Sequence, residues 1–115
     1  MNLYYAHSKK IYNTEVEEDE YSKIRKRFPD AHIVCPNRDV GEKGSINPYL
    51  QVVKQCDVVV CSEFKKLVGK GVATEVTTAI SDKKPVYNLS KDFKEVSGIK
   101  LVNNGKDWVE YARLI

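Results

Sequence analysis

The sequence predicts an α/β fold in which a parallel sheet of four to five strands is covered by helices on both faces. Short apolar runs alternate with amphipathic stretches along the whole chain. The run DVVVCSE (57–63) contains three consecutive valines, which is typical of a central parallel strand buried on both faces. A length of 115 residues, 42% of them hydrophobic, suits a single domain spanning 1–115.

The first strand is predicted over 2–7 (NLYYAH), and a helix follows it. Thr14 has the side chain of a helix N-cap, and Glu17 stands three residues later as in a capping box. The acidic first half and basic second half of this stretch agree with the helix dipole. Pro29 ends the helix.

A second strand is predicted over 32–36 (HIVCP), followed by a polar, glycine-containing loop over 37–46. Asn47 and Pro48 mark the next helix start, with asparagine as the cap and proline at the first helical position. This helix is expected to end near Cys56.

The third strand, 57–63, leads through a loop into a helix over 72–82. A fourth strand is predicted over 84–89 (KPVYNL), and 98–102 (GIKLV) is expected to be a last short strand. An apolar stripe in 106–115 (KDWVEYARLI) predicts a closing helix.

This order of elements predicts a flavodoxin-like, Rossmann-like three-layer sandwich with right-handed crossovers. Such sheets bind ligands beyond the carboxyl ends of their strands, where the strand order reverses. The loops over 6–13, 37–47 and 62–72 are therefore expected to form the site.

Composition excludes several classes of partner. The net charge of +3 is too small to indicate a nucleic acid polymer. No apolar run approaches the roughly 20 residues that a membrane span requires, so no membrane partner is expected. The first residues lack the pattern of a signal peptide, and a cytoplasmic location is expected.

The cysteines do not indicate a metal site. Cys35, Cys56 and Cys61 have no zinc-ligand spacing, and His7 and His32 do not complete a ligand set. We expect buried free thiols, no metal and no cofactor. A catalytic Cys61 assisted by His7 is an alternative without a motif behind it.

Basic and glycine residues gather in the three expected loops. Lys70 lies between Gly69 and Gly71 at a helix entrance, where backbone N–H groups and the helix dipole favour a phosphate. The other lysines of these loops fit an ordinary surface. Asn37 and Asp39 follow the second strand. A nucleotide or sugar phosphate is the expected small-molecule ligand.

Glu75 lies in the first turns of the same helix, beside its buried face. Interaction with the helix dipole alone explains many carboxylates at such positions. A carboxylate at the mouth of a parallel sheet is also a candidate catalytic group.

The segment 55–87 resembles the core of the nucleoside 2-deoxyribosyltransferase and deoxynucleoside-monophosphate N-glycosidase family. The shared pattern is an aspartate before an apolar strand, a glycine-containing loop, a glutamate, an alanine, and then lysine-proline-valine. The matching residues are Asp57, Val58, Val59, Val60, Gly69, Gly71, Glu75, Ala79, Lys84, Pro85 and Val86. The opening LYYAHS also resembles the family's first strand, and together these motifs extend over about three quarters of the chain.

The resemblance implies a covalent mechanism in which Glu75 attacks the anomeric carbon of a deoxyribosyl group and Tyr4 orients the carboxylate. Ser8 and the loop from Gly69 to Gly71 would hold the 5′ end of the ligand, with Lys70 favouring a phosphate. It also implies a homodimer or a larger homo-oligomer. The stripe of Trp108, Tyr111 and Ile115 could serve that interface or pack on its own sheet.

Three positions depart from the family pattern. Tyr49 stands where the family has an aspartate, Gly69 where the transferases have an acidic residue, and His7 where a small residue is usual. These departures weaken the transferase assignment most, and they leave a monophosphate glycosidase with His7 or Asp39 as a substitute acid.

Two other functional hypotheses are consistent with the sequence. One is a non-catalytic nucleotide-binding module, such as a sensor or a sequestering protein. The other is a phosphoribohydrolase of the lysine-decarboxylase-like type, which ranks third because GKGVATE (69–75) lacks a proline-glycine-glycine loop. The loops after the first and third strands do not carry the motifs of a phospho-receiver or of a flavodoxin.

Overall fold

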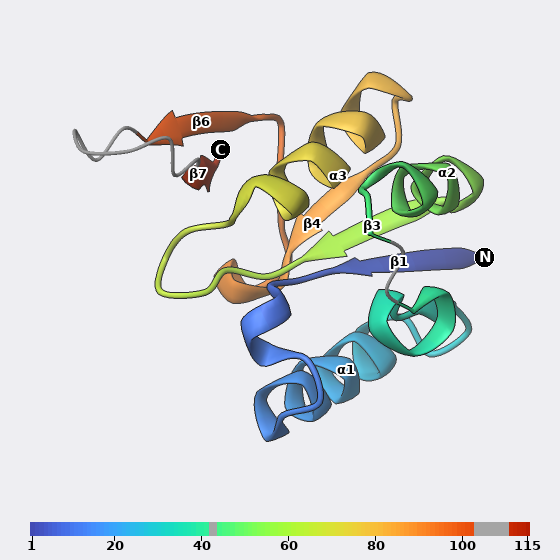
Figure 1. Ribbon diagram of the computed structural model, residues 1–115. Helices are drawn as coiled ribbons and strands as arrows, with labels where there is room; N and C mark the ends of the chain where they lie inside the picture. The colour runs from blue at the N-terminus through green and yellow to red at the C-terminus, as the bar shows by residue number, and fades with distance from the viewer. Residues whose placement is uncertain (42–43, 103–110) are drawn as a thin grey trace.

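The computed structural model, which describes residues 1–41, 44–102 and 111–115, contains a five-stranded sheet (Figure 1). Its strand order is β2-β1-β3-β4-β5, the flavodoxin-like order, which confirms the predicted fold class. Four strands are parallel: β1 (Asn2–Ala6), β2 (His32–Val34), β3 (Val58–Cys61) and β4 (Val86–Asn88). The two-residue β5 (Lys94–Glu95) pairs antiparallel with β4 at the sheet edge.

Helices cover both faces of the sheet (Figure 1). Helix α1 (Glu15–Arg27) lies on one face, and α2 (Asn47–Gln55) and α3 (Lys70–Ser81) lie on the other. Short helical turns follow β1 (Lys9–Ile11), β2 (Pro36–Val40, a π-turn) and β4 (Leu89–Lys91).

The protein has two hydrophobic cores, one on each face of the sheet, and strand β1 supplies side chains to both. Leu3 and Tyr5 are fully buried in the core under α1, and Tyr4 and Ala6 are fully buried in the core under α2 and α3. This alternation follows from the two-residue period of a strand. It brings the Tyr4 side chain to α3, the helix that carries Glu75.

The three long helices exist as predicted, but the residues that cap their N-termini differ in part from the predicted ones. Thr14 caps α1 by accepting a hydrogen bond from the Glu17 N–H at 3.4 Å, as predicted. The Glu17 carboxylate completes no capping box, because it turns inward and accepts from the Asn13 N–H instead. The N-cap of α2 is Ile46, so the predicted cap Asn47 is already the first helical residue. Helix α3 begins two residues before the predicted start at 72, because Gly69 is its N-cap.

The predicted closing helix over 106–115 is wrong where the structure describes it. Tyr111–Leu114 forms a strand, β7, that pairs antiparallel with β6 (Ile99–Val102). The predicted strand over 98–102 therefore exists, but it does not join the main sheet. Trp108 lies outside the described residues.

Tertiary pairing explains the strand at the C-terminus. The backbone N–H and carbonyl of Ala112 both pair with Val68, each at 2.9 Å, and Ala112 is buried against the α3 side of the core. A helix over 111–114 would break these bonds and the ladder to β6. Backbone pairing with two distant segments thus overrides the local helical stripe.

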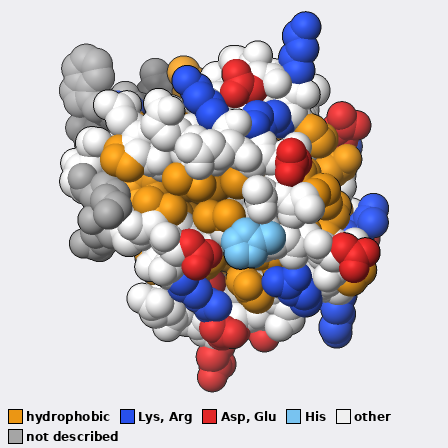
Figure 2. All heavy atoms as spheres, turned by 90° about the vertical axis from the view of Figure 1, so that its right-hand side faces the viewer, with side chains coloured by type: hydrophobic (Ala, Val, Ile, Leu, Met, Phe, Trp, Pro, Cys, Tyr) orange, Lys and Arg blue, Asp and Glu red, His pale blue; other side chains and the backbone are white. Residues whose placement is uncertain are grey.

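On the face where β1 begins, neither basic nor acidic side chains predominate. Figure 2 shows basic and acidic side chains interspersed around a hydrophobic area on this face. Among the described residues, no helix has the length and apolar character needed to cross a membrane.

Candidate functional site

A pocket of about 540 Å³ opens beside the carboxyl end of β1 and the N-terminus of α3. Three segments line it: the turn after β1, the loop before α2 with the first turn of α2, and the first two turns of α3. The lining residues are His7, Ser8, Lys9, Tyr12, Gly44, Ser45, Ile46, Tyr49, Gly69, Lys70, Gly71, Val72, Thr74 and Glu75. This is the sheet end at which the sequence predicts a ligand, next to the point where the chain crosses from β2 over β1 to β3.

The centre of the pocket wall is a paired glutamate and tyrosine. Glu75 lines the pocket and is only 6% exposed, and the fully buried Tyr4 hydroxyl donates a hydrogen bond to its carboxylate. Burial raises the pKa of Glu75 to about 7, although the Tyr4 hydrogen bond works in the opposite direction. Burial and the neighbouring Glu75 charge raise the pKa of Tyr4, so its hydroxyl keeps its proton and donates a hydrogen bond to the carboxylate.

The two glycines at the α3 start leave room for a ligand. A Cβ at Gly69 would meet nothing within 4 Å, and one at Gly71 would meet only Ile46 Cδ1 at 4.0 Å. Neither glycine is therefore required by the packing of the chain itself. Both glycines line the pocket, so the absence of their side chains leaves more room in the pocket for a ligand. This room lies beside the backbone N–H groups that begin α3.

His7 lines the pocket, but both of its ring nitrogens are engaged inside the protein. Nδ1 lies 2.9 Å from the Tyr5 carbonyl oxygen, and Nε2 lies 2.6 Å from Glu17 Oε2. The ring stacks on Tyr5, with centroids 3.7 Å apart. His7 therefore contributes a ring wall to the pocket, and neither nitrogen is placed to give a proton to a ligand there.

Tyr12 is one of the pocket residues that the sequence analysis did not select as a site residue. It lines the pocket, and its ring packs against His7 at a centroid distance of 4.8 Å. Burial is the main cause that raises its pKa, and the Glu75 charge adds to it. Its position within the expected loop 6–13 was the one feature of the sequence that could have indicated a site residue. An isolated tyrosine in a loop belongs to no recognisable motif.

Comparison of the sequence with known family models and with curated proteins finds no match. A solved deoxyribosyltransferase structure is similar to this fold. It is a 2-desoxiribosyltransferase from Leishmania mexicana, with a TM-score of 0.55 and 20% sequence identity over 76% of this chain. The match covers 62% of that protein, so this chain spans less than two thirds of its length. At this identity the likeness shows the fold alone.

Tyr49 and Ser8, two further predicted ligand-binding residues, line the pocket with internal hydrogen bonds of their own. The Tyr49 hydroxyl donates to the Gly41 carbonyl oxygen, and the Ser8 hydroxyl accepts from the Lys10 N–H at 3.2 Å. Lys70 also lines the pocket, beside the two glycines.

Asn37 and Asp39 are not among the lining residues of this pocket. Asp39 accepts a hydrogen bond from the Cys35 N–H at 2.7 Å, which closes the turn after β2. The Asn37 carboxamide contacts the Cys35 thiol and the Glu17 carboxylate. Asn37 and Asp39 therefore contact residues near the inward-facing side of His7, and they do not lie beside Glu75.

All three cysteines are buried free thiols, as expected. Burial raises the pKa of Cys35 to about 11 and raises the pKa of Cys56 and Cys61 as well. Cys61 donates to the Tyr87 carbonyl oxygen at 3.4 Å, while His7 is held by Tyr5 and Glu17. Nothing in this arrangement activates Cys61 as a nucleophile.

Proposed function

We propose that this chain cleaves the N-glycosidic bond of a nucleoside or nucleotide, with Glu75 as the nucleophile and Tyr4 as the residue that orients it. The observation that carries the proposal is the Glu75 carboxylate, buried in the wall of an open pocket and held by the Tyr4 hydroxyl. The flavodoxin-like fold, similar to that of a deoxyribosyltransferase, supports it.

The proposed reaction has two steps. A Glu75 carboxylate oxygen bonds to the anomeric carbon, the bond from this carbon to the base nitrogen breaks, and its electron pair leaves with the base. A proton must reach the base as it leaves. Water or a second base then attacks the anomeric carbon and releases the Glu75 carboxylate, so the configuration is retained overall.

The surroundings of Glu75 suit the first step. The ionised carboxylate is the attacking form, and its burial leaves it poorly solvated and therefore reactive. With a pKa of about 7, a large fraction is ionised at neutral pH. The Tyr4 hydroxyl holds one oxygen and leaves the other available to the ligand.

The proton donor for the departing base is assigned to Tyr12 within this proposal. Tyr12 lines the same pocket, and a tyrosine hydroxyl can act as a general acid. The two donors suggested by the sequence fit less well, because His7 uses both ring nitrogens internally and Asp39 does not line the pocket.

A phosphate on the ligand would lie at the start of α3. The backbone N–H groups after Gly69 and the positive end of the helix dipole favour an anion, and the glycines leave it space. The pocket volume of about 540 Å³ is within the usual range for small-molecule sites. We therefore expect nucleoside monophosphates to be better substrates than nucleosides.

A second candidate function is nucleotide binding without cleavage. Among the lining residues, all of them in the described part of the chain, Glu75 is the only acidic one. Tyr49 occupies the position of a family aspartate and donates its hydroxyl to Gly41. A pocket with a single carboxylate fits a binding module as well as an enzyme.

Incubation with each deoxynucleoside monophosphate, followed by chromatography for free base, separates the two candidates. Base release that Glu75→Gln abolishes supports the enzyme. Saturable binding by calorimetry with no release from any monophosphate, with or without an added acceptor base, refutes the enzyme and supports the module. Light scattering on the same samples tests the homodimer that the family resemblance implies.

A further inference from the structure

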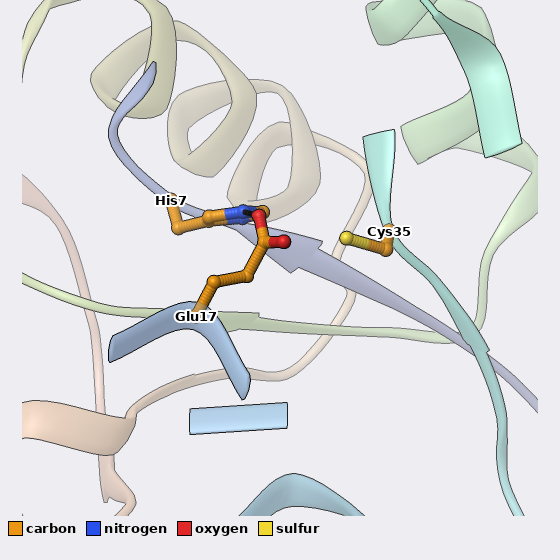
Figure 3. Close-up of side chains that lie close together, drawn as sticks. All are labelled: His7, Glu17 and Cys35. Carbon is orange, nitrogen blue, oxygen red and sulfur yellow. Dashed lines mark hydrogen bonds and ion pairs between the residues drawn. The ribbon is translucent and has the colours of Figure 1, made fainter. Parts of the chain in front are cut away.

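On the α1 side of β1, away from Glu75, three metal-ligating side chains converge. His7, Glu17 and Cys35 come from the end of β1, the first turn of α1 and the residue after β2 (Figure 3). One donor atom from each lies within 4.8 Å of the other two, and all three residues are buried. Nitrogen, oxygen and sulfur donors together are a ligand set that suits Zn²⁺.

His7 directs its second ring nitrogen at the Glu17 carboxylate. The Tyr5 carbonyl oxygen can only accept, so His7 Nδ1 carries a hydrogen toward it at 2.9 Å. In a neutral ring, Nε2 would then present a lone pair to Glu17 Oε2 at 2.6 Å. Two acceptors stay this close only when a proton or a metal ion lies between them.

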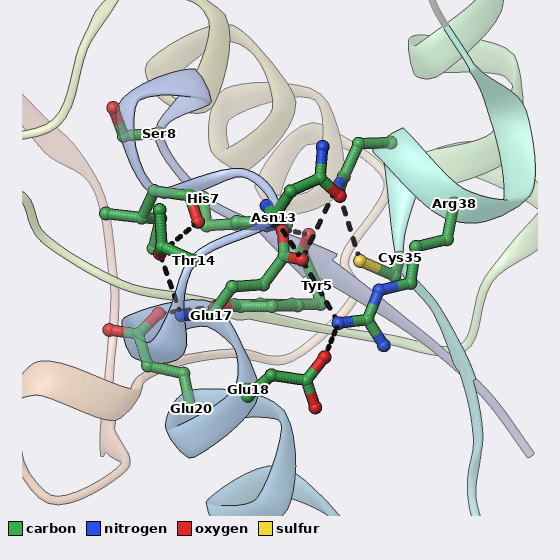
Figure 4. A network of polar contacts seen from close by, with 12 residues as sticks. Tyr5, His7, Ser8, Asn13, Thr14, Glu17, Glu18, Glu20, Cys35 and Arg38 are labelled. Atoms are coloured by element: carbon green, nitrogen blue, oxygen red, sulfur yellow. Dashed lines mark hydrogen bonds and ion pairs between the residues drawn. The ribbon is translucent and has the colours of Figure 1, made fainter.

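The contacts around the cluster match those that surround metal ligands. A ligating histidine commonly donates its other nitrogen to a backbone carbonyl, as His7 does to Tyr5. The second oxygen of Glu17 is fixed by the Asn13 N–H at 3.2 Å and by Arg38 at 3.1 Å (Figure 4). This leaves Oε2 as the single oxygen that faces His7.

A fourth donor is close to the sulfur. The Asn37 carboxamide oxygen lies 3.1 Å from Cys35 Sγ, and the Asn37 amide group is held by contacts of 3.4 Å to Asn13 and Glu17. Tetrahedral Zn²⁺ with bonds of about 2.0 Å to nitrogen and oxygen places those atoms roughly 3.3 Å apart. On metal binding, the His7–Glu17 separation of 2.6 Å must therefore open by less than an ångström, and donor atoms that now lie up to 4.8 Å apart must approach one another.

The charges of the proposed ligands also suit a divalent metal ion. The Glu17 carboxylate and a Cys35 thiolate, formed when metal binding releases the thiol proton, together balance its two positive charges. The Arg38 guanidinium, the other charged group in contact with Glu17, keeps its ion pair in both states. Of the three proposed ligands, His7 lines the pocket, while the His7 and Glu17 side chains are fully buried.

We propose that His7, Glu17 and Cys35 bind one Zn²⁺ ion, with the Asn37 carboxamide oxygen or a water as the fourth ligand. The ion is structural: it ties the turn after β1, the start of α1 and the end of β2 to one another. These segments stand behind the His7 and Tyr12 wall of the pocket. The site is separate from Glu75, so the proposal does not depend on the proposed glycosidic chemistry.

The test uses the full chain after treatment with a chelator and removal of that chelator. Calorimetric titration with ZnCl₂ is expected to show one site per chain. CoCl₂ in place of zinc is expected to give the intense visible bands of four-coordinate cobalt and a near-ultraviolet thiolate-to-cobalt transition. The Cys35→Ser variant is expected to lose that transition and at least tenfold in zinc affinity.

Two matched variants serve as controls. Cys56→Ser removes another buried thiol, and His32→Asn removes the exposed histidine; both are expected to bind zinc as the unmodified chain does. If Cys35→Ser does not fold, Glu17→Gln replaces it and is expected to weaken zinc binding at least tenfold while keeping the cobalt–thiolate transition. The absence of a zinc site, a six-coordinate cobalt spectrum without thiolate, or loss of binding in His32→Asn overturns the proposal.

Discussion

Glu75→Gln is expected to stabilise the folded chain at pH 8 while it abolishes any base release. The amide keeps the shape of the carboxyl, and its oxygen can still accept from the Tyr4 hydroxyl. What it removes is the charge that burial disfavours. A group placed for function at the expense of stability behaves in this way.

The magnitude follows from the pKa of the buried carboxyl. Burial raises the pKa of Glu75 from 4.5 to about 7. Each pKa unit corresponds to about 1.4 kcal/mol, so this change corresponds to about 3 kcal/mol. Between pH 4.5 and 7 the unfolded chain ionises at Glu75 while the folded chain still holds the proton, so folding stability falls as pH rises through this window.

The assay is urea unfolding followed by circular dichroism, at several pH values between 4 and 8, for the unmodified chain and for Glu75→Gln. Other groups titrate alike in both proteins and cancel in the difference. The stability of Glu75→Gln relative to the unmodified chain should therefore increase by about 3 kcal/mol from pH 4 to pH 8. The exposed Glu95→Gln is the matched control, and its difference should stay flat. A flat difference for Glu75→Gln as well would show that water reaches the carboxyl, and the nucleophile assignment would lose its physical basis.

Three further changes test other parts of the structure. Tyr4→Phe removes the hydrogen bond that lowers the pKa of Glu75, so the pH at which base release reaches its plateau should move upward; an unchanged pH profile would contradict the orienting role. Gly71→Ala adds a methyl group in open pocket space, so it should keep or raise stability by up to about 1 kcal/mol, while calorimetry should show weaker binding of monophosphates. Lys84→Met removes the ammonium group that donates to the carbonyl oxygens of Lys54 and Cys56 at the end of α2, so it should lower the free energy of unfolding in urea by about 2 kcal/mol and leave base release unchanged.

The parallel sheet was predictable because its signals are local. The valine run of β3 and the apolar runs of β1 and β4 each indicate a buried strand, and Thr14 and Pro48 mark helix starts through their own chemistry. The C-terminus was not predictable in this way. Residues 111–115 have a helical stripe, and only the partners that the fold brings to them, Val68 and β6, make them a strand.

In the candidate site, too, residues marked by a sequence pattern were predictable, and residues brought together only by the fold were not. Glu75 and Tyr4 were predicted as site residues because a family pattern marks both positions, and the structure adds that they share a hydrogen bond across 71 positions of sequence. Tyr12 was missed because no pattern marks it. The cluster of His7, Glu17 and Cys35 could not be found from spacing, since metal motifs are recognised when ligands lie a few residues apart. Here the fold collects one ligand from each of three elements.

The alternation of β1 links the two sites that we propose. Tyr4 faces the core under α3 and holds Glu75, while Tyr5, the next residue, faces the core under α1 and stacks on His7. The strand therefore supports Glu75 on one face of the sheet and His7 on the other, and both of these residues line the same pocket. A change confined to one face should leave the chemistry of the other intact. Glu75→Gln should bind zinc as the unmodified chain does, and Cys35→Ser should retain the Glu75 pH dependence of stability; joint loss in a variant that still folds would show that the two faces are not independent.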